Sequence, residues 1–262
     1  MSFSPRVAAS ALIFPVVSCL FGSSALAQHL DGALAAHGGL AKWKSYGSVE
    51  FNQTWISAKG VKKDHQLFDL HSRAGLITSD KYTLGTSNGE VWIKPALDAL
   101  GGTPPRFYMW TPFYFFGMPF VFADPGAVQE PLGKKTFQGQ EYDAVKITFQ
   151  RGTGDSSEDF YVAYVDPTSR QLKLVSYVVT FAALRKGKPM DQLEPHALVF
   201  EEWQDAVGLR VPKRGSFYNW KNETIEGEAL GVMEFSNVRF SEKSPDAKQF
   251  TKPADAVLAP LE

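Results

Sequence analysis

Residues 76–94 read Leu-Ile-Thr-Ser-Asp-Lys-Tyr-Thr-Leu-Gly-Thr-Ser-Asn-Gly-Glu-Val-Trp-Ile-Lys, and this stretch decides the fold class. Asn88-Gly89 separates two runs that favour strands, residues 76–84 and 90–94. Both central residues of a type I′ turn need a positive φ, which asparagine and glycine tolerate best. The stretch therefore predicts two antiparallel strands joined by a tight turn.

Strand patterns continue on both sides of this hairpin. Val49, Phe51 and Trp55 alternate with polar residues, and residues 67–70 form a further short strand. Later strands are expected at residues 142–149, 160–165, 172–181, 197–203, 211–220 and 231–240, with turns at 166–169, 187–189, 207–208 and 226–227. Residues 29–46 predict an N-terminal amphipathic helix that breaks at Gly38-Gly39. Because long helices do not alternate with strands, we expect a mainly β protein: a curved antiparallel sheet of roughly ten strands.

The first 27 residues have the three parts of a secretory signal peptide. A short basic region ends at Arg6, an apolar region covers residues 7–21, and Ser-Ala-Leu-Ala ends at Ala27. We expect cleavage after Ala27, export to the periplasm or beyond, and a single domain over residues 28–262. Val16-Val17-Ser18-Cys19 resembles a lipobox, so a lipoprotein anchored through Cys19 is the alternative.

Charge and motifs exclude several function classes. The chain carries 27 basic and 28 acidic residues, a balance that does not favour nucleic-acid binding. Its five histidines form no H-x-x-x-H pair, and no P-loop or G-x-G-x-x-G occurs, so neither a metal site nor a cofactor is expected. Cys19 is the only cysteine, so a chain cleaved after Ala27 has no disulfide and no thiol nucleophile.

The aromatic segment, residues 107–122, reads FYMWTPFYFFGMPFVF and contains no charge. Nine of its sixteen residues are aromatic, and each buried ring gains about 1.5–3 kcal/mol over an exposed one. The segment is too short and too rich in proline to span a membrane. Two interpretations stay open: it packs the core of the curved sheet, or it is a lid or plug across an apolar cavity.

A serine hydrolase is one alternative. Residues 85–89 match G-x-S-x-G, Asp166 and His196 follow Ser87 in the order serine, acid, histidine, and His37-Gly38-Gly39 resembles an oxyanion-hole signature. A nucleophile elbow, however, needs a helix after the serine, and residues 90–93 favour a strand. We therefore interpret Ser87 as part of a hairpin tip and His37 as a structural residue.

Four short stretches together resemble a known superfamily: residues 49–53, 88–93, 164–167 and 172–175, which read VEFNQ, NGEVWI, YVDP and LKLV. In this pattern, over most of residues 28–262, the chain resembles the LolA/LolB-type periplasmic lipoprotein carriers. The resemblance implies an unclosed β-barrel whose helices or loops cover a hydrophobic cavity, and uptake of acyl chains without catalysis. The carriers' lid-holding arginine has no aligned counterpart here, so outer membrane lipoprotein sorting itself is not implied.

The leading hypothesis is a periplasmic, non-catalytic binding or carrier protein for a lipid or other hydrophobic ligand. Transient contact with a membrane or a lipoprotein fits this role, and an envelope protein–protein interaction module is a further alternative. The residues expected on the concave, ligand-binding face are Phe51, Trp55, Trp92, Phe149, Tyr177, Phe181, Trp203 and Trp220. The residues expected in the lid are Trp110, Phe113, Phe115, Phe116 and Phe120.

Overall fold

The structure, a computed structural model, describes residues 29–156 and 158–260. Over these residues thirteen strands form one antiparallel sheet in the order β13-β5-β4-β3-β2-β1-β12-β11-β10-β9-β8-β7-β6. The two edge strands, β13 and β6, do not pair with each other within the described chain, so the sheet is open. The expected curved, unclosed antiparallel sheet is confirmed. The signal-peptide assignment and Cys19 lie outside the described residues.

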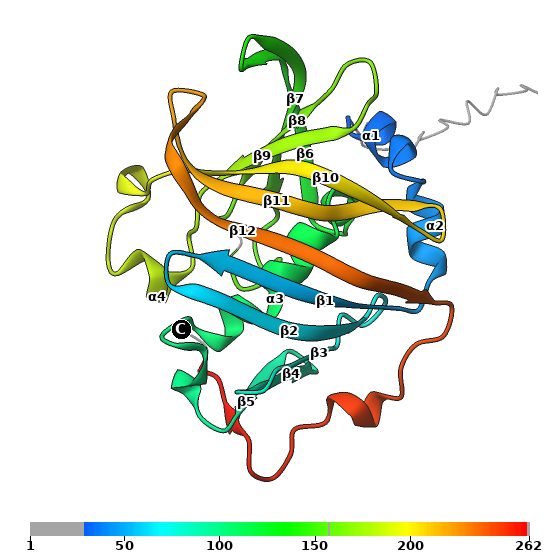
Figure 1. Ribbon diagram of the computed structural model, residues 1–262, viewed down its shortest axis with the longest axis vertical. Helices are drawn as coiled ribbons and strands as arrows, with labels where there is room; N and C mark the ends of the chain where they lie inside the picture. The colour runs from blue at the N-terminus through cyan, green and yellow to red at the C-terminus, as the bar shows by residue number, and fades with distance from the viewer. Residues whose placement is uncertain (1–28, 157, 261–262) are drawn as a thin grey trace, which may run out of the picture.

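Two meanders make up the sheet (Figure 1). The first consists of β1 (Ser48–Ser57), β2 (Gly60–Asp69), β3 (Gly75–Thr78), β4 (Thr83–Ser87) and β5 (Glu90–Lys94). The second consists of β6 (Ala127–Phe137), β7 (Gln140–Phe149), β8 (Tyr161–Val165), β9 (Leu172–Tyr177), β10 (His196–Ala206), β11 (Leu209–Lys221) and β12 (Thr224–Ser241). β12 pairs with β1 from Ser241 opposite Ser48 to Val232 opposite Ile56, which joins the two meanders. The short β13 (Val257–Leu258) extends the edge at β5.

Short helices surround the sheet. At the N-terminal side, α1 (Asp31–Ala36) and α2 (Leu40–Ser45) are separated by Gly38 and Gly39, whose φ angles of 105° and 93° confirm the expected break. The remaining helices are η1 (Leu97–Leu100), α3 (Pro105–Phe116), η2 (Phe120–Ala123), α4 (Ala182–Arg185), η3 (Met190–Gln192) and η4 (Ala247–Phe250). Among the described residues no helix has the length and apolarity needed to cross a bilayer.

Helix α3 contains most of the aromatic segment and lies inside the curve of the sheet. Pro105 starts it at a position where a missing N–H costs nothing, since first-turn N–H groups have no helical partner. Apolar residues occur all round the helix, which is typical of a helix surrounded by protein. Figure 1 shows α3 crossing behind β1, β11 and β12.

The two faces of the sheet are filled differently. Val165, Val175 and Leu198 belong to the main core on the side of α3. Their chain neighbours Tyr164, Leu174 and Ala197 belong to a second cluster, because successive strand residues point to opposite faces. The second cluster also includes Phe137 of β6 and Trp220 of β11, so it lies on the outer face of the second meander.

Several expected boundaries were wrong. Residues 76–84 are not one strand, because a turn closed by the Ser79 N–H and the Tyr82 carbonyl, 2.9 Å apart, separates β3 from β4. The strand expected at 172–181 ends at Tyr177. The turn expected at 226–227 lies at Asn222 and Glu223, both with positive φ, and β12 runs through residues 226–227. β6, β13 and the helical character of α3 were not predicted.

Candidate functional site

Helix α3 fills the concave face of the sheet with aromatic rings. Phe116 stacks on Phe51 of β1 with centroids 4.2 Å apart, and Phe113 packs on Phe68 of β2 at 4.4 Å. Phe115 lies 5.3 Å from Tyr177 of β9. Residues expected in the lid thus lie directly against residues expected on the concave face.

Further rings extend this contact in both directions. Tyr114 lies 6.2 Å from Phe149, and Phe107 lies 5.6 Å from Phe181. After α3, Phe120 stacks on Trp43 of α2 at 4.7 Å. Trp110 is only partly buried and lies at the edge of the main core, near Phe68. Of the expected lid, Phe113, Phe115, Phe116 and Phe120 are buried in the core.

Two more expected concave-face residues lie near the site without touching α3 through a ring contact. Trp55 lies 5.2 Å from Phe217, which itself lies 5.2 Å from Phe115. Trp203 lies 4.3 Å from His37, beyond the C-terminus of α1. Both border the main core, so they belong to the same face as α3.

The placement of Trp92 and Trp220 on the concave face was wrong. Val91 and Ile93 face the main core, and Trp92 points the other way, where its indole N–H donates to the carbonyl of Phe250 at 3.0 Å. Trp92 packs closely over Gly85, where a Cβ would lie 2.3 Å from the indole. Trp220 belongs to the outer cluster, 5.8 Å from Phe137. Period-two alternation predicted that these residues are buried but not on which face.

A partly buried ion pair joins the start of α3 to the loops around it. The guanidinium of Arg106 donates from Nε and Nη2 to the two carboxylate oxygens of Asp155, at 2.8 and 2.7 Å. Its Nη1 donates to the carbonyl of Gly89, in the β4–β5 turn, at 3.2 Å. Such a fork-to-fork arrangement is the strongest pairing of these groups. Arg106 was not among the residues predicted from the sequence, although its position directly before the uncharged aromatic segment could have pointed to it.

A second ion pair ties the end of the aromatic segment. Nη2 of Arg73, in the β2–β3 turn, lies 2.6 Å from both carboxylate oxygens of Asp124, just after η2. The guanidinium also lies 5.2 Å from the ring centre of Phe113. Burial raises the pKa of the Asp124 carboxyl, and Arg73 opposes that shift.

The third tie is a buried polar cluster around Asp64 of β2, on the concave face. The Tyr108 hydroxyl of α3 lies 2.6 Å from Oδ2 of Asp64, and the Tyr82 hydroxyl lies 2.8 Å from the same oxygen. Gln66 Nε2 donates to Oδ1 at 2.9 Å and to Oε1 of Gln53 at 2.7 Å. Burial raises the pKa of Asp64, although these hydrogen bonds lower it in part. No ion pair to Asp64 occurs among the described residues, so its charge is held by neutral donors.

Three residues of the hydrolase alternative lie at a hairpin tip, in the core and in a turn. Ser87 ends β4 opposite Glu90 of β5, and Asn88 and Gly89 between them have φ of 55° and 80°, so the hairpin tip is confirmed and a strand follows it. His37 is fully buried: Nδ1 lies 2.9 Å from the Arg210 carbonyl and Nε2 accepts from the Leu172 N–H at 3.2 Å. Asp166 accepts the N–H groups of Thr168 and Ser169 in the β8–β9 turn.

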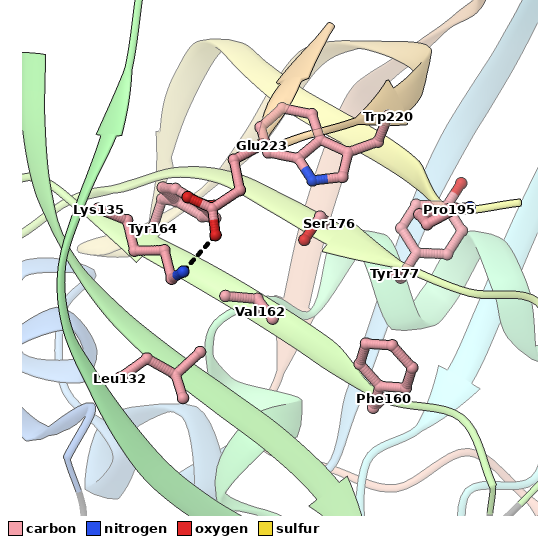
Figure 2. Close-up of a pocket in the computed structure, with 10 residues that line it drawn as sticks. All are labelled: Leu132, Lys135, Phe160, Val162, Tyr164, Ser176, Tyr177, Pro195, Trp220 and Glu223. Atoms are coloured by element: carbon pink, nitrogen blue, oxygen red, sulfur yellow. Dashed lines mark hydrogen bonds and ion pairs between the residues drawn. The ribbon is translucent and has the colours of Figure 1, made fainter. Parts of the chain in front are cut away.

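Two depressions open on the molecule. The first, with a volume of about 190 Å³, lies on the outer face between β6 and the β11–β12 hairpin (Figure 2). Rings and aliphatic groups line it, and an ion pair between Lys135 and Glu223 crosses one side. The second, of about 340 Å³, is polar and includes Gln53 and Asp64 in its lining, with Asn52, Thr54, Lys63 and Ser236. Over residues 29–156 and 158–260, no group of three or more His, Cys, Asp or Glu side chains is placed to hold a metal ion.

The architecture matches a solved structure at low sequence identity. A LolA superfamily protein from Nitrosomonas europaea aligns with a TM-score of 0.53 and 10% identity, over 84% of this chain and 97% of that one. The chain has a LolA-like fold. The resemblance to this superfamily is therefore confirmed at the level of the fold.

Other comparisons are more distant. A DUF1329 family protein from Desulfovibrio piger aligns with a TM-score of 0.46 and 11% identity, over 80% of this chain and 91% of that one. A domain described as an outer membrane lipoprotein-sorting protein, from Vibrio parahaemolyticus, gives a TM-score of 0.42 and 14% identity over the same shares. Residues 106–223 match the model of a family of unknown function, DUF6503. No curated protein sequence matches the chain.

Proposed function

We propose that this LolA-like protein is a non-catalytic carrier for a long-chain lipid, which binds on the concave face after α3 withdraws. Export to the periplasm is part of this proposal. One observation carries it: the rings of the short helix α3 occupy apolar space directly against strands of the concave face. An acyl chain offers the same kind of surface to Phe51, Phe68 and Tyr177 as α3 does.

The energetics set a lower limit on the ligand's length. Exposing Phe113, Phe115 and Phe116 costs about 5–9 kcal/mol, at about 1.5–3 kcal/mol for each ring. A chain of about 16 methylenes recovers about 13 kcal/mol, and one of about 8 methylenes only about 6 kcal/mol. A chain of about 16 methylenes therefore offsets the withdrawal of α3 over the whole range of this cost, and one of about 8 offsets it only at the lower end.

Three side-chain contacts, the ties described above, hold α3 and must break for it to withdraw. Arg106–Asp155, Tyr108–Asp64 and Arg73–Asp124 join the aromatic segment to turns and strands that belong to the sheet. Gly101 and Gly102, both with positive φ, precede α3 and supply a flexible connection. Breaking the first two ties frees the N-terminal half of the helix.

A crosslink across the first tie tests the proposal. In a Cys19→Ser background, Arg106→Cys with Asp155→Cys places the only two thiols of the chain on either side of the contact. A short bifunctional thiol reagent fastens α3 to the sheet, and a monofunctional reagent alkylates the same thiols without fastening it. We expect the fastened protein to lose uptake of a fluorescent long-chain fatty alcohol and the alkylated protein to keep it. Equal uptake by both would contradict withdrawal of α3.

The second candidate function is an envelope protein–protein interaction module. The observation that favours it is the apolar depression beside the edge strand β6, lined in part by Leu132, Phe160 and Val162. Leu132→Glu places a charge in this depression and leaves the concave face unchanged. Loss of a stoichiometric protein partner with this variant, together with unchanged lipid uptake, would favour the second candidate.

A further inference from the structure

The concave face contains an ionisable group that a purely apolar ligand does not need. Asp64 is 6% exposed, and among the described residues it has hydrogen bonds but no ion pair. Burying a carboxylate without a cation is costly unless several donors surround it. The hydrogen-bond donors around Asp64 therefore determine which chemical group can bind beside it.

When α3 moves, two of the three hydrogen-bond donors to Asp64 remain on the sheet and the third moves away with the helix. Gln66 lies on β2 itself and Tyr82 lies in the β3–β4 turn, so both remain when α3 moves. The Tyr108 hydroxyl is part of α3 and makes the shortest contact, 2.6 Å. Withdrawal of α3 therefore removes one of the two hydroxyl donors to Oδ2 of Asp64 and leaves only that of Tyr82. A hydrogen bond to a charged group is typically worth about 1.5–3 kcal/mol.

The cluster around Asp64 is rich in acceptors. Oε1 of Gln53 lies 3.2 Å from the Tyr108 hydroxyl, whose single proton is directed to Asp64 at the shorter distance. Oε1 of Gln66 is buried and has no hydrogen-bond partner among the described residues. A group that takes the place of the Tyr108 hydroxyl meets Oδ2 of Asp64 and Oε1 of Gln53, both acceptors, so it must donate. An anionic group is repelled by the carboxylate.

We propose that the carried lipid bears a neutral or cationic hydrogen-bond donor, a hydroxyl or an amine, at one end, and that this donor takes the place of the Tyr108 hydroxyl on Asp64. This inference rests on the proposed function, since it needs the concave face to accept a lipid. It assigns the ligand class: long-chain alcohols, amines and hydroxyl-bearing lipids, in preference to free fatty acids. Tyr108 is then a stand-in for the ligand's head group in the unliganded protein.

The test compares ligands that share one tail. Oleyl alcohol, oleate and methyl oleate are titrated into the full chain below their micelle concentrations, at about pH 8, where an ordinary carboxyl is ionised. Binding is followed by native mass spectrometry and titration calorimetry. We expect oleyl alcohol to bind the unmodified protein at least about tenfold more tightly than oleate, with methyl oleate also weaker than the alcohol.

Three variants separate the contribution of the head group from that of the tail. Asp64→Asn removes the charge, so the affinity ratio of alcohol to oleate should fall toward one. Asp80→Asn, an exposed acid in the nearby β3–β4 turn, makes the same charge change and should leave the ratio unchanged. Tyr108→Phe keeps the ring but removes the hydroxyl, so alcohol and ester should gain affinity by the same factor.

The outcomes distinguish this inference from the proposed function. If none of the three ligands binds to the unmodified protein or to Tyr108→Phe, the carrier function fails and the inference fails with it. If oleate binds as tightly as oleyl alcohol, or if Asp64→Asn and Asp80→Asn change the ratio equally, the inference is overturned while the carrier function stands. Should Asp64→Asn not fold, the ratio in the unmodified protein decides.

Discussion

Phe116 of α3 stacks on Phe51 of β1, with ring centroids 4.2 Å apart and planes inclined by 22°. Both side chains are fully buried. Phe116→Ala removes one half of this stack and leaves a cavity, so we expect a loss of about 3–5 kcal/mol in the free energy of unfolding. Urea unfolding followed by tryptophan fluorescence measures it. Leu230→Ala, at an exposed position of β12, should change stability by less than about 0.5 kcal/mol.

The buried imidazole of His37 leads us to expect a loss of stability in mild acid. Burial lowers its pKa from 6.5 to about 4, so the unfolded chain binds a proton below pH 6.5 that the folded chain refuses until about pH 4. Stability from this group is therefore present above pH 6.5 and falls by about 3 kcal/mol across the interval. Unfolding free energies measured at several pH values should fall less steeply for His37→Gln than for the unmodified protein.

For Asp64 we expect a pH dependence of the unfolding free energy opposite in sign to that of His37. Because burial raises its pKa, the folded chain holds a proton over a pH interval in which the unfolded chain has lost it. This group's contribution therefore falls as pH rises from the ordinary carboxyl range through the raised pKa. The stability of Asp64→Asn relative to the unmodified protein should grow with pH over that interval, as determined by urea unfolding. A relative stability that does not change with pH would mean that the Asp64 carboxyl titrates normally.

Ser87 gives a test of the hydrolase alternative. The residues after it form β5 rather than a helix, so Ser87 lacks the strand–serine–helix arrangement of a nucleophile elbow. Hydrolysis of a chromogenic short-chain ester by purified protein should stay at background and be identical in Ser87→Ala. A rate above background that disappears in the variant would restore the enzyme hypothesis.

The sequence predicted elements whose signal is local. Asn88-Gly89 specifies a two-residue turn, and the structure has both residues at positive φ. The Gly38-Gly39 break and the turn after Val165 have the same origin. In each case backbone sterics of a few neighbouring residues determine the conformation, so no knowledge of distant contacts is required.

Elements that depend on distant contacts could not be predicted. The aromatic segment is apolar on every side, so it has no 3.6-residue period that would mark α3 as a helix, and Pro112 argued against one. β6 is an edge strand with mixed polar and charged residues, which hides its alternation. The ties of α3 join residues 44 to 51 positions apart, such as Arg106 and Asp155, and only the folded chain brings them together.

The pairing of β1 with β12 has a consequence for how the chain reaches its native state. β1 begins at Ser48, and its partner strand ends at Ser241, so one side of β1 has no hydrogen-bonding neighbour until nearly the whole polypeptide is available. Contacts of such sequence separation form slowly, and an unpaired strand edge invites association with other chains. A nascent chain that lacks residues 224–241 therefore exposes the unpaired edge of β1 to association with other chains.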